Sequence, residues 1–359
     1  MLTAEGCRAR RQRLLDALQP TAPLVLNDPL NLRYFAGCSV DPFSLGADFG
    51  ALLRIEPSGR ATLFHDHRLP KSVELAHVDE RVPLPWYDGK SPGAGPRRWV
   101  LHETLAQNGG RIHDALTDPD AERLWGCVQT LRRAKDPDEV ALLRSCMRAT
   151  EAGHAWARSN VTVGITELDV YNGVFAACTR VAGQPVIVYG DFTVSTGSKK
   201  RGGPPTDHVL QAGETLILDY SVVIGGYRSD FTNTLVVGGS PTAEQRRLFD
   251  LSLAAMAAGE ATLKPGAPCR LVYDAVRGVF DKEGLAAAFP HHAGHGLGVS
   301  HPESPFLVER ATETLVVGDV VTLEPGLYVD GVGGVRVEHN YLITDAGYER
   351  LSRHTLSLT

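Results

Sequence analysis

The stretch TLILDYSVVIGGYRSDFTNT, residues 215–234, consists of two apolar segments joined by a Gly-Gly pair, which favours the tight turn of a β-hairpin. With these glycines as the two loop residues, Asp219 lies opposite Thr232, and Asp230 is its diagonal neighbour on the same face. Diagonal neighbours are roughly 7–8 Å apart at the backbone. Two carboxylates at that spacing repel each other unless a cation lies between them, so the hairpin points to a cation site.

Residues 320–338 repeat this arrangement further along the chain. An apolar strand ends at Glu324, a glycine-rich turn follows at 330–334, and a return strand carries Arg336 and Glu338. Side chains two apart on a strand share a face, so the arginine and the second glutamate point together. A single strand-end acid is more often solvated than functional, but the recurrence favours a site built from both hairpins.

Between the hairpins, residues 291–301 read HHAGHGLGVSH and contain four of the chain's 13 histidines. Glycine allows the backbone to approach a ligand closely. Two aspartates, two glutamates and one histidine can bind two divalent cations, and such an oxygen-rich site suits manganese, cobalt, iron or zinc. Two metals about 3.5–4 Å apart activate water at neutral pH. By spacing alone, a metal site and a set of ordinary solvated side chains remain open alternatives.

Composition limits the class of protein. The 359 residues favour roughly two domains, and 43% hydrophobic with 22% charged residues is typical of globular chains. The formal charge of −6 argues against a nucleic-acid-binding protein, which needs a basic face. No apolar run reaches the ~18 residues of a membrane span, and the N-terminus lacks the apolar core of a secretory signal. Six scattered cysteines without a CxxC pair indicate thiols in a reducing cytoplasm.

The order of the expected elements indicates an α+β fold in two domains. The N-terminal part combines a short strand with a hairpin, and the boundary falls near residues 128–137, which gives domains at 1–130 and 131–359. A helix is expected to begin at Asp136, because aspartate caps, proline suits the first position and a glutamate follows three residues after the cap. Further helices are expected to begin near 166 and 240, with strands at 215–223, 227–237, 320–323 and 335–343.

Five blocks, in this order, resemble the pita-bread metallopeptidases, which include methionine aminopeptidase, aminopeptidase P and prolidase (Xaa-Pro dipeptidase). The blocks are RRAKDPDEVALLR, LILDY with YRSDFTNT, HHAGHGLG, TLEPGLYV and GVRVE. The N-terminal third, with NDPLNLRYFAG, resembles the creatinase-like domain of the proline-specific branch, which methionine aminopeptidases lack. The resemblance implies a small creatinase-like α/β domain over 1–130 and a pita-bread catalytic domain of antiparallel hairpins and helices over 131–359.

The resemblance also implies a site with two divalent metal ions per chain, manganese first and cobalt or zinc next. Glu324 would carry a proton to the leaving nitrogen, His291 would bind substrate, and Arg336 would orient the site or hold a substrate carboxylate. The implied metal ligands are Asp219, Asp230, His295, Glu324 and Glu338.

The chain departs from the family pattern at three positions. Gly202 stands where the family has a histidine before the first aspartate ligand, and Asn233 replaces an arginine. Pro302 stands at the place of a second family histidine, and His301 precedes it by one residue. A bulge or turn would aim His301 into the cleft as a catalytic group. Alternatively it faces solvent, and His291 or its neighbour His292 supplies the proton.

The expected function is cytoplasmic, dinuclear metal-dependent hydrolysis of the Xaa-Pro bond in dipeptides, with a homodimer expected by analogy. The partner is a small peptide with proline at its second position, not nucleic acid or membrane. Asp41 or Arg33 of the N-terminal domain would help to close the cleft. The alternatives are an aminopeptidase P that acts on longer peptides, a metal-binding pita-bread protein without hydrolysis, and a creatinase-like C–N hydrolase without metal. The five intact ligands argue against the last.

Overall fold

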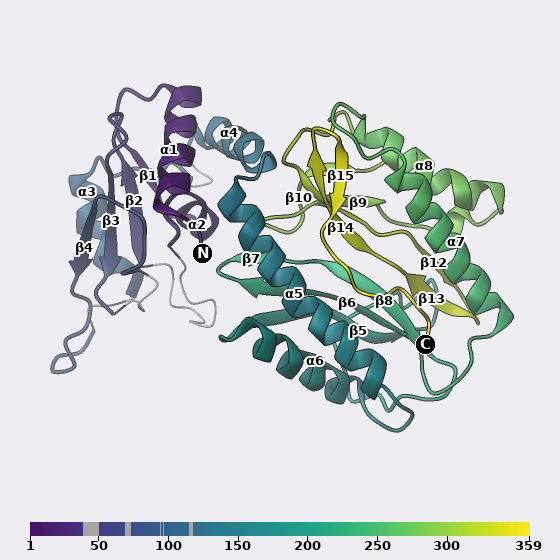
Figure 1. Cartoon of the computed structure of the whole chain (residues 1–359). Helices are drawn as coiled ribbons and strands as arrows, with labels where there is room; N and C mark the ends of the chain where they lie inside the picture. The colour runs from purple at the N-terminus through teal and green to yellow at the C-terminus, as the bar shows by residue number, and fades with distance from the viewer. Residues whose placement is uncertain (39–49, 69–72, 94, 96, 115–117) are drawn as a thin grey trace. The chain divides into compact units, whose positions relative to one another are not determined.

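The computed structural model describes residues 1–38, 50–68, 73–93, 95, 97–114 and 118–359, so Asp41 lies outside the described residues. The chain divides into two compact units, Met1–Arg132 and Arg133–Thr359 (Figure 1). Within the described part of the chain, no helix combines the length and the apolar composition that a membrane span requires.

The first unit combines a four-stranded sheet with helices. The strands lie in the order β1 (Leu24–Leu26), β2 (Ala51–Ile55), β3 (Ala61–Asp66) and β4 (Glu80–Leu84). The helical segments are α1 (Ala4–Leu18), α2 (Pro29–Ala36), the 3₁₀ turn Arg97–Leu101, α3 (His102–Gln107) and α4 (Ala121–Arg133). The antiparallel pairing of β2 with β3 confirms the expected hairpin. Apolar side chains of α1, α2 and α4 pack with the strands in one core.

The helical segments of the second unit include three that begin close to the predicted residues and a further helix, α8, that was not predicted. They are α5 (Pro137–Asn160), α6 (Glu167–Ala182), α7 (Ala243–Glu260), α8 (Cys269–Lys282) and the 3₁₀ turn Ala286–Ala288. At the start of α5, the Glu139 carboxylate accepts from the backbone N–H of Asp136 at 2.9 Å, which confirms the predicted capping box. Capping boxes at Thr166 and Thr242 begin α6 and α7 in the same way.

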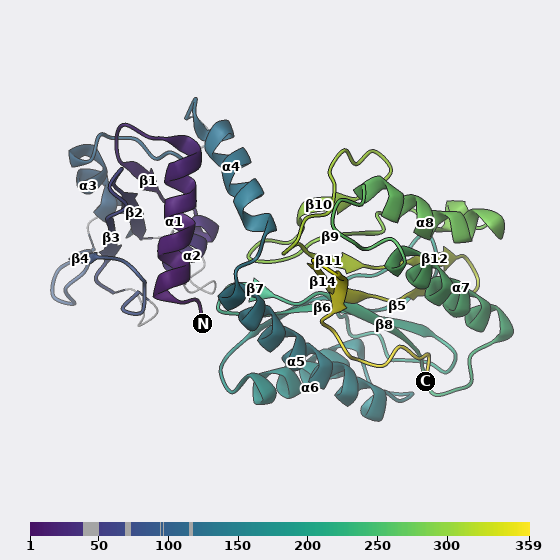
Figure 2. The ribbon, with the colours of Figure 1, turned by 45° about the horizontal axis from the view of Figure 1, so that its top comes forward.

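The strands of the second unit form two larger sheets and one hairpin. One sheet contains β5 (Ile187–Ser195), β6 (Thr215–Ile224), β7 (Tyr227–Arg228) and β8 (Phe231–Val236). The other has the order β10 (Glu303–Leu307), β9 (Gly294–Gly296), β11 (Val320–Leu323), β14 (His339–Thr344) and β15 (Gly347–Arg350). The hairpin pairs β12 (Gly326–Val329) with β13 (Gly333–Arg336). Helices α5 and α6 lie beside the first sheet, and α7 and α8 beside the second (Figures 1 and 2).

The first hairpin has the predicted register. Asp219 on β6 lies opposite Thr232 on β8, so the two sequence segments pair as expected. The return strand of the second hairpin differs from the prediction, because residues 335–343 do not form one strand. β13 ends at Arg336, and β14 begins in another sheet. The backbone N–H of Glu338 donates instead to the Thr232 carbonyl at 3.1 Å, which holds Glu338 against the first hairpin.

A stack of buried rings lies behind β8. The ring of His354 lies 4.7 Å from that of His154 and 4.5 Å from that of Phe231, between centroids. One ring nitrogen of His354 donates to the carbonyl of Thr232 at 3.1 Å. Burial lowers the pKa of His354 to about 4. Between about pH 4 and pH 6.5, this imidazole is therefore neutral in the folded chain and protonated in the unfolded chain.

We expect the free energy of unfolding to fall as the pH falls from about 6.5 to about 4, with His354 contributing about 3 kcal/mol of the loss. Unfolded chains bind the proton below pH ~6.5 and folded ones only near the lowered pKa, so acid favours the unfolded state. Urea unfolding of wild type and His354→Phe, both with chelator, measures this. The free energy of unfolding of the variant should depend less on pH than that of wild type. His102→Phe, at an exposed position, is the control, and parallel curves for wild type and His354→Phe would contradict the prediction.

Candidate metal centre

Strand ends from both larger sheets bring the five predicted metal ligands together. Each ligand lies within a strand of these sheets or directly beside one. They are Asp219 in β6, Asp230 between β7 and β8, His295 in β9, Glu324 directly after β11, and Glu338 between β13 and β14. Asp230, His295, Glu324 and Glu338 are buried, with at most 7% of each residue exposed. The tertiary fold thus assembles side chains that are separated by more than a hundred residues in the chain.

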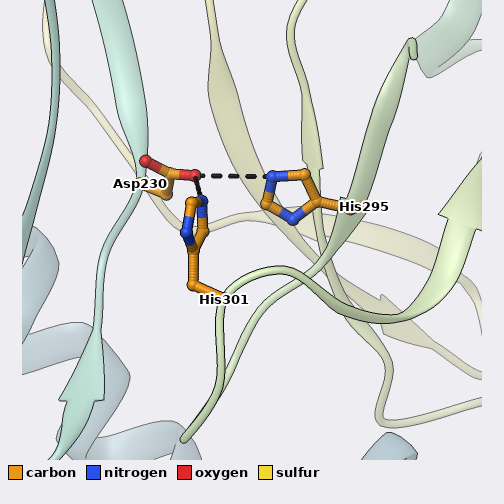
Figure 3. A group of neighbouring side chains, drawn as sticks. All are labelled: Asp230, His295 and His301. Atoms are coloured by element: carbon orange, nitrogen blue, oxygen red, sulfur yellow. Dashed lines mark hydrogen bonds and ion pairs between the residues drawn. The ribbon is translucent and has the colours of Figure 1, made fainter. Parts of the chain in front are cut away.

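Asp230 is the centre of one group within this cluster (Figure 3). Its Oδ2 lies 2.7 Å from Nε2 of His301 and 3.6 Å from Nε2 of His295. Nδ1 of His295 donates to the Gly296 carbonyl at 2.9 Å. A proton on Nδ1 leaves the lone pair of Nε2 directed at the carboxylates, which is the arrangement that a metal-binding imidazole needs.

Glu324 is the centre of a second group. Its Oε1 lies 3.1 Å from Nε2 of His292 and 3.5 Å from Nε2 of His295, and it accepts from the hydroxyl of Thr322 at 3.1 Å. Burial alone would raise the pKa of this carboxyl, but the neighbouring histidines, His292 foremost, outweigh it and lower the pKa. Glu324 is therefore ionised at neutral pH and can accept a proton.

The third group consists of carboxylates. Oxygens of Asp219, Asp230 and Glu338 all lie within 4.8 Å of one another. Burial, with repulsion from Asp230, raises the pKa of Asp219 to about 7 against the opposing effect of Arg336. Burial and the same two aspartates raise the pKa of Glu338. So many buried acids are costly in a protein unless cations compensate them.

This donor set fits divalent cations. Oε2 of Glu338 accepts from the Thr232 hydroxyl at 2.7 Å, but the buried Oε1 has no hydrogen-bond partner among the described residues. Buried carboxylate oxygens normally have such a partner, so this oxygen is available to a metal. Four carboxylates and one imidazole Nε2 offer the hard oxygen-rich environment that manganese and similar ions prefer.

Arg336 lies between two acids. One of its terminal nitrogens is 2.5 Å from Oδ2 of Asp191 and 2.7 Å from Oδ2 of Asp219, and the other donates to the hydroxyl of Tyr328 at 3.2 Å. Tyr328 in turn lies 3.2 Å from Nε2 of His291. The guanidinium is therefore held within the site, and its terminal nitrogens face groups of the protein itself.

The segment that carries His301 is irregular and held by a buried ion pair. Residues 298–302 form bends rather than a strand, so the side chain need not follow strand alternation. Nζ of Lys135 lies 2.7 Å from Oε1 of Glu303, and both side chains are at most 7% exposed. Oε2 of Glu303 accepts from the backbone N–H of Ser300 at 3.2 Å. These contacts direct the His301 ring to Asp230.

At Gly202, where the family histidine is missing, the neighbouring strand fills the space. A Cβ at this position would lie 1.9 Å from Oδ2 of Asp191, so any side chain would displace the partner of Arg336. Asp191 is not among the predicted site residues, because no strand was predicted over β5. It lies directly opposite Asp219 across β5 and β6. The apolar runs before and after Asp191 were the available indication of a strand, but its pairing partner follows only after a long loop.

A cavity of about 490 Å³ adjoins the site. Its lining includes Glu324, His291, His292, Arg336 and residues 199–203. This volume is in the range of pockets that hold small ligands.

His301→Ala is expected to lower kcat at least roughly tenfold without changing metal content, because a positioned acid–base group contributes about 10²–10⁴ in rate. The ring contacts Asp230, and Asp230 raises the pKa of His301 against the opposing effect of burial, which favours the protonated form that can donate a proton. Steady-state kinetics and elemental analysis of the same preparation check this. Near wild-type kcat for His301→Ala, with His291→Ala crippled, would assign His301 no part in the reaction.

Comparison with known proteins gives consistent results. The family model described as "Metallopeptidase family M24" matches residues 141–345. An uncharacterized peptidase of Staphylococcus aureus (strain USA300) is 29% identical over 345 residues, which is 92% of this chain and 94% of the relative. A solved Xaa-Pro dipeptidase from Bacillus anthracis has a TM-score of 0.80 at 24% identity, with 98% of this chain and 99% of that chain covered. An X-Pro aminopeptidase from Thermotoga maritima has a TM-score of 0.78 at 19% identity, with 100% and 99% covered.

Proposed function

The chain belongs to metallopeptidase family M24, with the two-domain α+β fold and pita-bread catalytic domain expected from the sequence, and from this premise we propose that it hydrolyses the Xaa-Pro bond of dipeptides with two divalent metal ions. One observation carries the proposal. Four buried or half-buried carboxylates and one imidazole converge, and the buried Oε1 of Glu338 has no hydrogen-bond partner within the described residues. Such a set is unfavourable by itself and favourable around cations.

The residues that would hold the metals are those that the sequence proposes. Manganese is the first choice for an oxygen-rich set with one imidazole, and cobalt or zinc would also fit. Bound metals of this kind polarise a carbonyl oxygen and lower the pKa of water to near neutrality. The proposed ligands are Asp219, Asp230, His295, Glu324 and Glu338.

Glu324 has the geometry of a proton carrier. Its carboxylate is ionised at neutral pH, so Oε1 can accept a proton from the attacking water and release it to the nitrogen of the departing proline. His292, 3.1 Å away, donates to this oxygen and fixes its position. His291 lines the cavity and presents its imidazole edge beside Tyr328, where it can contact a bound peptide.

Of the two roles considered for Arg336, its contacts favour orientation of the site. The guanidinium holds Asp219 at 2.7 Å and Asp191 at 2.5 Å. An arginine whose charge and N–H groups already bind two carboxylates binds a third carboxylate only weakly. We therefore assign Arg336 to the alignment of Asp219 rather than to the substrate.

The proline preference rests on likeness of fold. The chain shares its length and both of its domains with solved chains that include an Xaa-Pro dipeptidase and an X-Pro aminopeptidase. The dipeptide preference is the part that distinguishes our proposal from an aminopeptidase P. A homodimer, as part of the same proposal, would be observed as twice the chain mass in solution.

Metal content and release of free proline test the proposal together. Protein purified gently, or reconstituted with manganese, should contain about two metals per chain and release proline from an Xaa-Pro dipeptide. Higher kcat/KM on the same peptide extended by one residue would favour the aminopeptidase. Bound metal with no hydrolysis of either peptide would indicate a binding protein, and full activity without metal would indicate creatinase-like chemistry.

A further inference from the structure

Three consecutive cations line the same cavity as Glu324, His291 and His292. They are Lys199, Lys200 and Arg201. All belong to the loop between β5 and β6, and Lys199 and Arg201 are exposed at the cavity edge. A run of basic residues on a surface is usually solvated, so the argument depends on how this loop is held and on which charges remain free.

The loop is fixed by hydrogen bonds within the second unit. The hydroxyl of Ser195 donates to the carbonyl of Lys200 at 2.7 Å, and the backbone N–H of Thr196 donates to the same carbonyl at 3.1 Å. The backbone N–H of Ser198 and its hydroxyl both donate to Oδ1 of Asp330, at 2.8 and 2.9 Å. The approach is close, because a Cβ on Gly197 would lie 2.7 Å from the backbone nitrogen of Asp330. These hydrogen bonds therefore fix the backbone of the turn that carries the three cations.

Charge pairing leaves Arg201 as the freest of these cations. Nζ of Lys200 lies 3.8 Å from Oε1 of Glu167, whose oxygens already accept hydrogen bonds from residues 193, 194 and 206. The pKa of the Asp330 carboxyl is lowered by the hydrogen bonds from Ser198 and, to a smaller extent, by the charge of Lys199. Within the described part of the chain, no carboxylate lies at ion-pair distance from Arg201. Its guanidinium can present two parallel N–H groups to a carboxylate.

A bound dipeptide would bring a negative charge into this cavity, which favours a cation among the residues that line it. A dipeptide cleaved at its one peptide bond carries its terminal carboxylate on the residue that leaves. Within the cavity, Asp191 and Glu324 would repel that carboxylate, and Arg336 is occupied by Asp191 and Asp219. The basic loop, which also lines the cavity, supplies the compensating charge.

We propose that Arg201, supported by Lys199 and Lys200, binds the free C-terminal carboxylate of the substrate and thereby selects short peptides that end directly after the scissile bond. This inference rests on the proposed peptidase function and assigns its specificity to residues outside the metal cluster. The basic loop, residues 199–201, would bind the carboxylate, while the metals and Glu324 would act on the peptide bond.

The experiment compares a free carboxylate with a blocked one. An uncleavable Xaa-Pro dipeptide analogue with a reduced peptide bond, as acid and as amide, is titrated calorimetrically into manganese-loaded wild type and Arg201→Gln. Wild type should bind the acid roughly ten- to a hundredfold more tightly than the amide, since a hydrogen bond to a charged group has that effect. In Arg201→Gln this ratio should fall towards one, with amide binding unchanged. Lys199→Gln and Lys200→Gln should reduce the ratio less, and Arg246→Gln, exposed on α7, should leave it as in wild type.

The outcomes separate the two proposals. Equal binding of acid and amide by wild type, or an unchanged ratio in Arg201→Gln, overturns the proposal that Arg201 binds the carboxylate, even if Xaa-Pro dipeptides are cleaved. A preference for the acid that depends on Arg201 supports carboxylate binding by Arg201 even if the reconstituted protein cleaves no Xaa-Pro bond. The absence of cleavage would then overturn the proposed function alone. With cleavable substrates, the same variant should raise KM for the dipeptide acid more than it lowers kcat.

Discussion

Asp219→Asn is expected to lower kcat/KM for an Xaa-Pro dipeptide by roughly 10³-fold or more, because several kcal/mol of transition-state stabilisation depend on the metal pair. The aspartate lies within 4.8 Å of oxygens of Asp230 and Glu338 and is aligned by Arg336. An amide of the same size cannot neutralise a cation, so metal content should fall below the wild-type value. Kinetics with elemental analysis measure both effects.

A stability measurement separates loss of metal from loss of fold. In the metal-free protein, burial and also repulsion from Asp230 disfavour the ionised form of Asp219 and raise its pKa against the opposing effect of Arg336. Removing one charge should leave the thermal midpoint of the metal-free variant equal to or above that of metal-free wild type, while stabilisation by added manganese is lost. Asp250→Asn, exposed on α7, is the matched control. Wild-type activity in a metal-free preparation, or retained metal stabilisation in Asp219→Asn, would refute the assignment.

Glu324→Gln should reduce kcat roughly 10²–10⁴-fold even at saturating metal, because the glutamine cannot accept a proton. Its geometry places Oε1 within 3.1 Å of His292 and of the Thr322 hydroxyl, so the amide can keep the position while losing the charge. The measurement is kcat as a function of manganese concentration. Glu309→Gln, at an exposed position, serves as the control.

The shape of that titration distinguishes two roles of Glu324. If high manganese restores wild-type kcat, the side chain acts as a metal ligand only. If kcat reaches a plateau far below wild type, the carboxylate also moves the proton. We expect the plateau, because Glu324 lines the cavity in which a peptide would bind and its Oε1 is held by His292 at 3.1 Å.

Local sequence was sufficient for the parts of the fold that depend on neighbours in the chain. The capping box at Asp136 and Glu139 and the hairpin register that sets Asp219 opposite Thr232 both involve residues close in sequence. Alternation along these strands then placed the acids on shared faces. The order of the motifs was enough to indicate the family, which the match over residues 141–345 shows.

Long-range packing decided what the sequence left open. Nothing near His301 in the chain indicates that it meets Asp230. That contact depends on Lys135, 168 residues from its partner Glu303, holding the bent segment. Asp191 meets Arg336 across 145 residues, and the space at Gly202 is filled by that pair.

The break between β13 and β14 has the same origin. Hydrophobic alternation predicted one continuous strand over residues 335–343, but the backbone at Glu338 pairs with Thr232 of the other hairpin. The sequence by itself determined which side chains are presented at each strand end, since strand geometry is local. Only the tertiary structure decided which of them meet, because the energies of buried charges depend on neighbours that the fold supplies from distant parts of the chain.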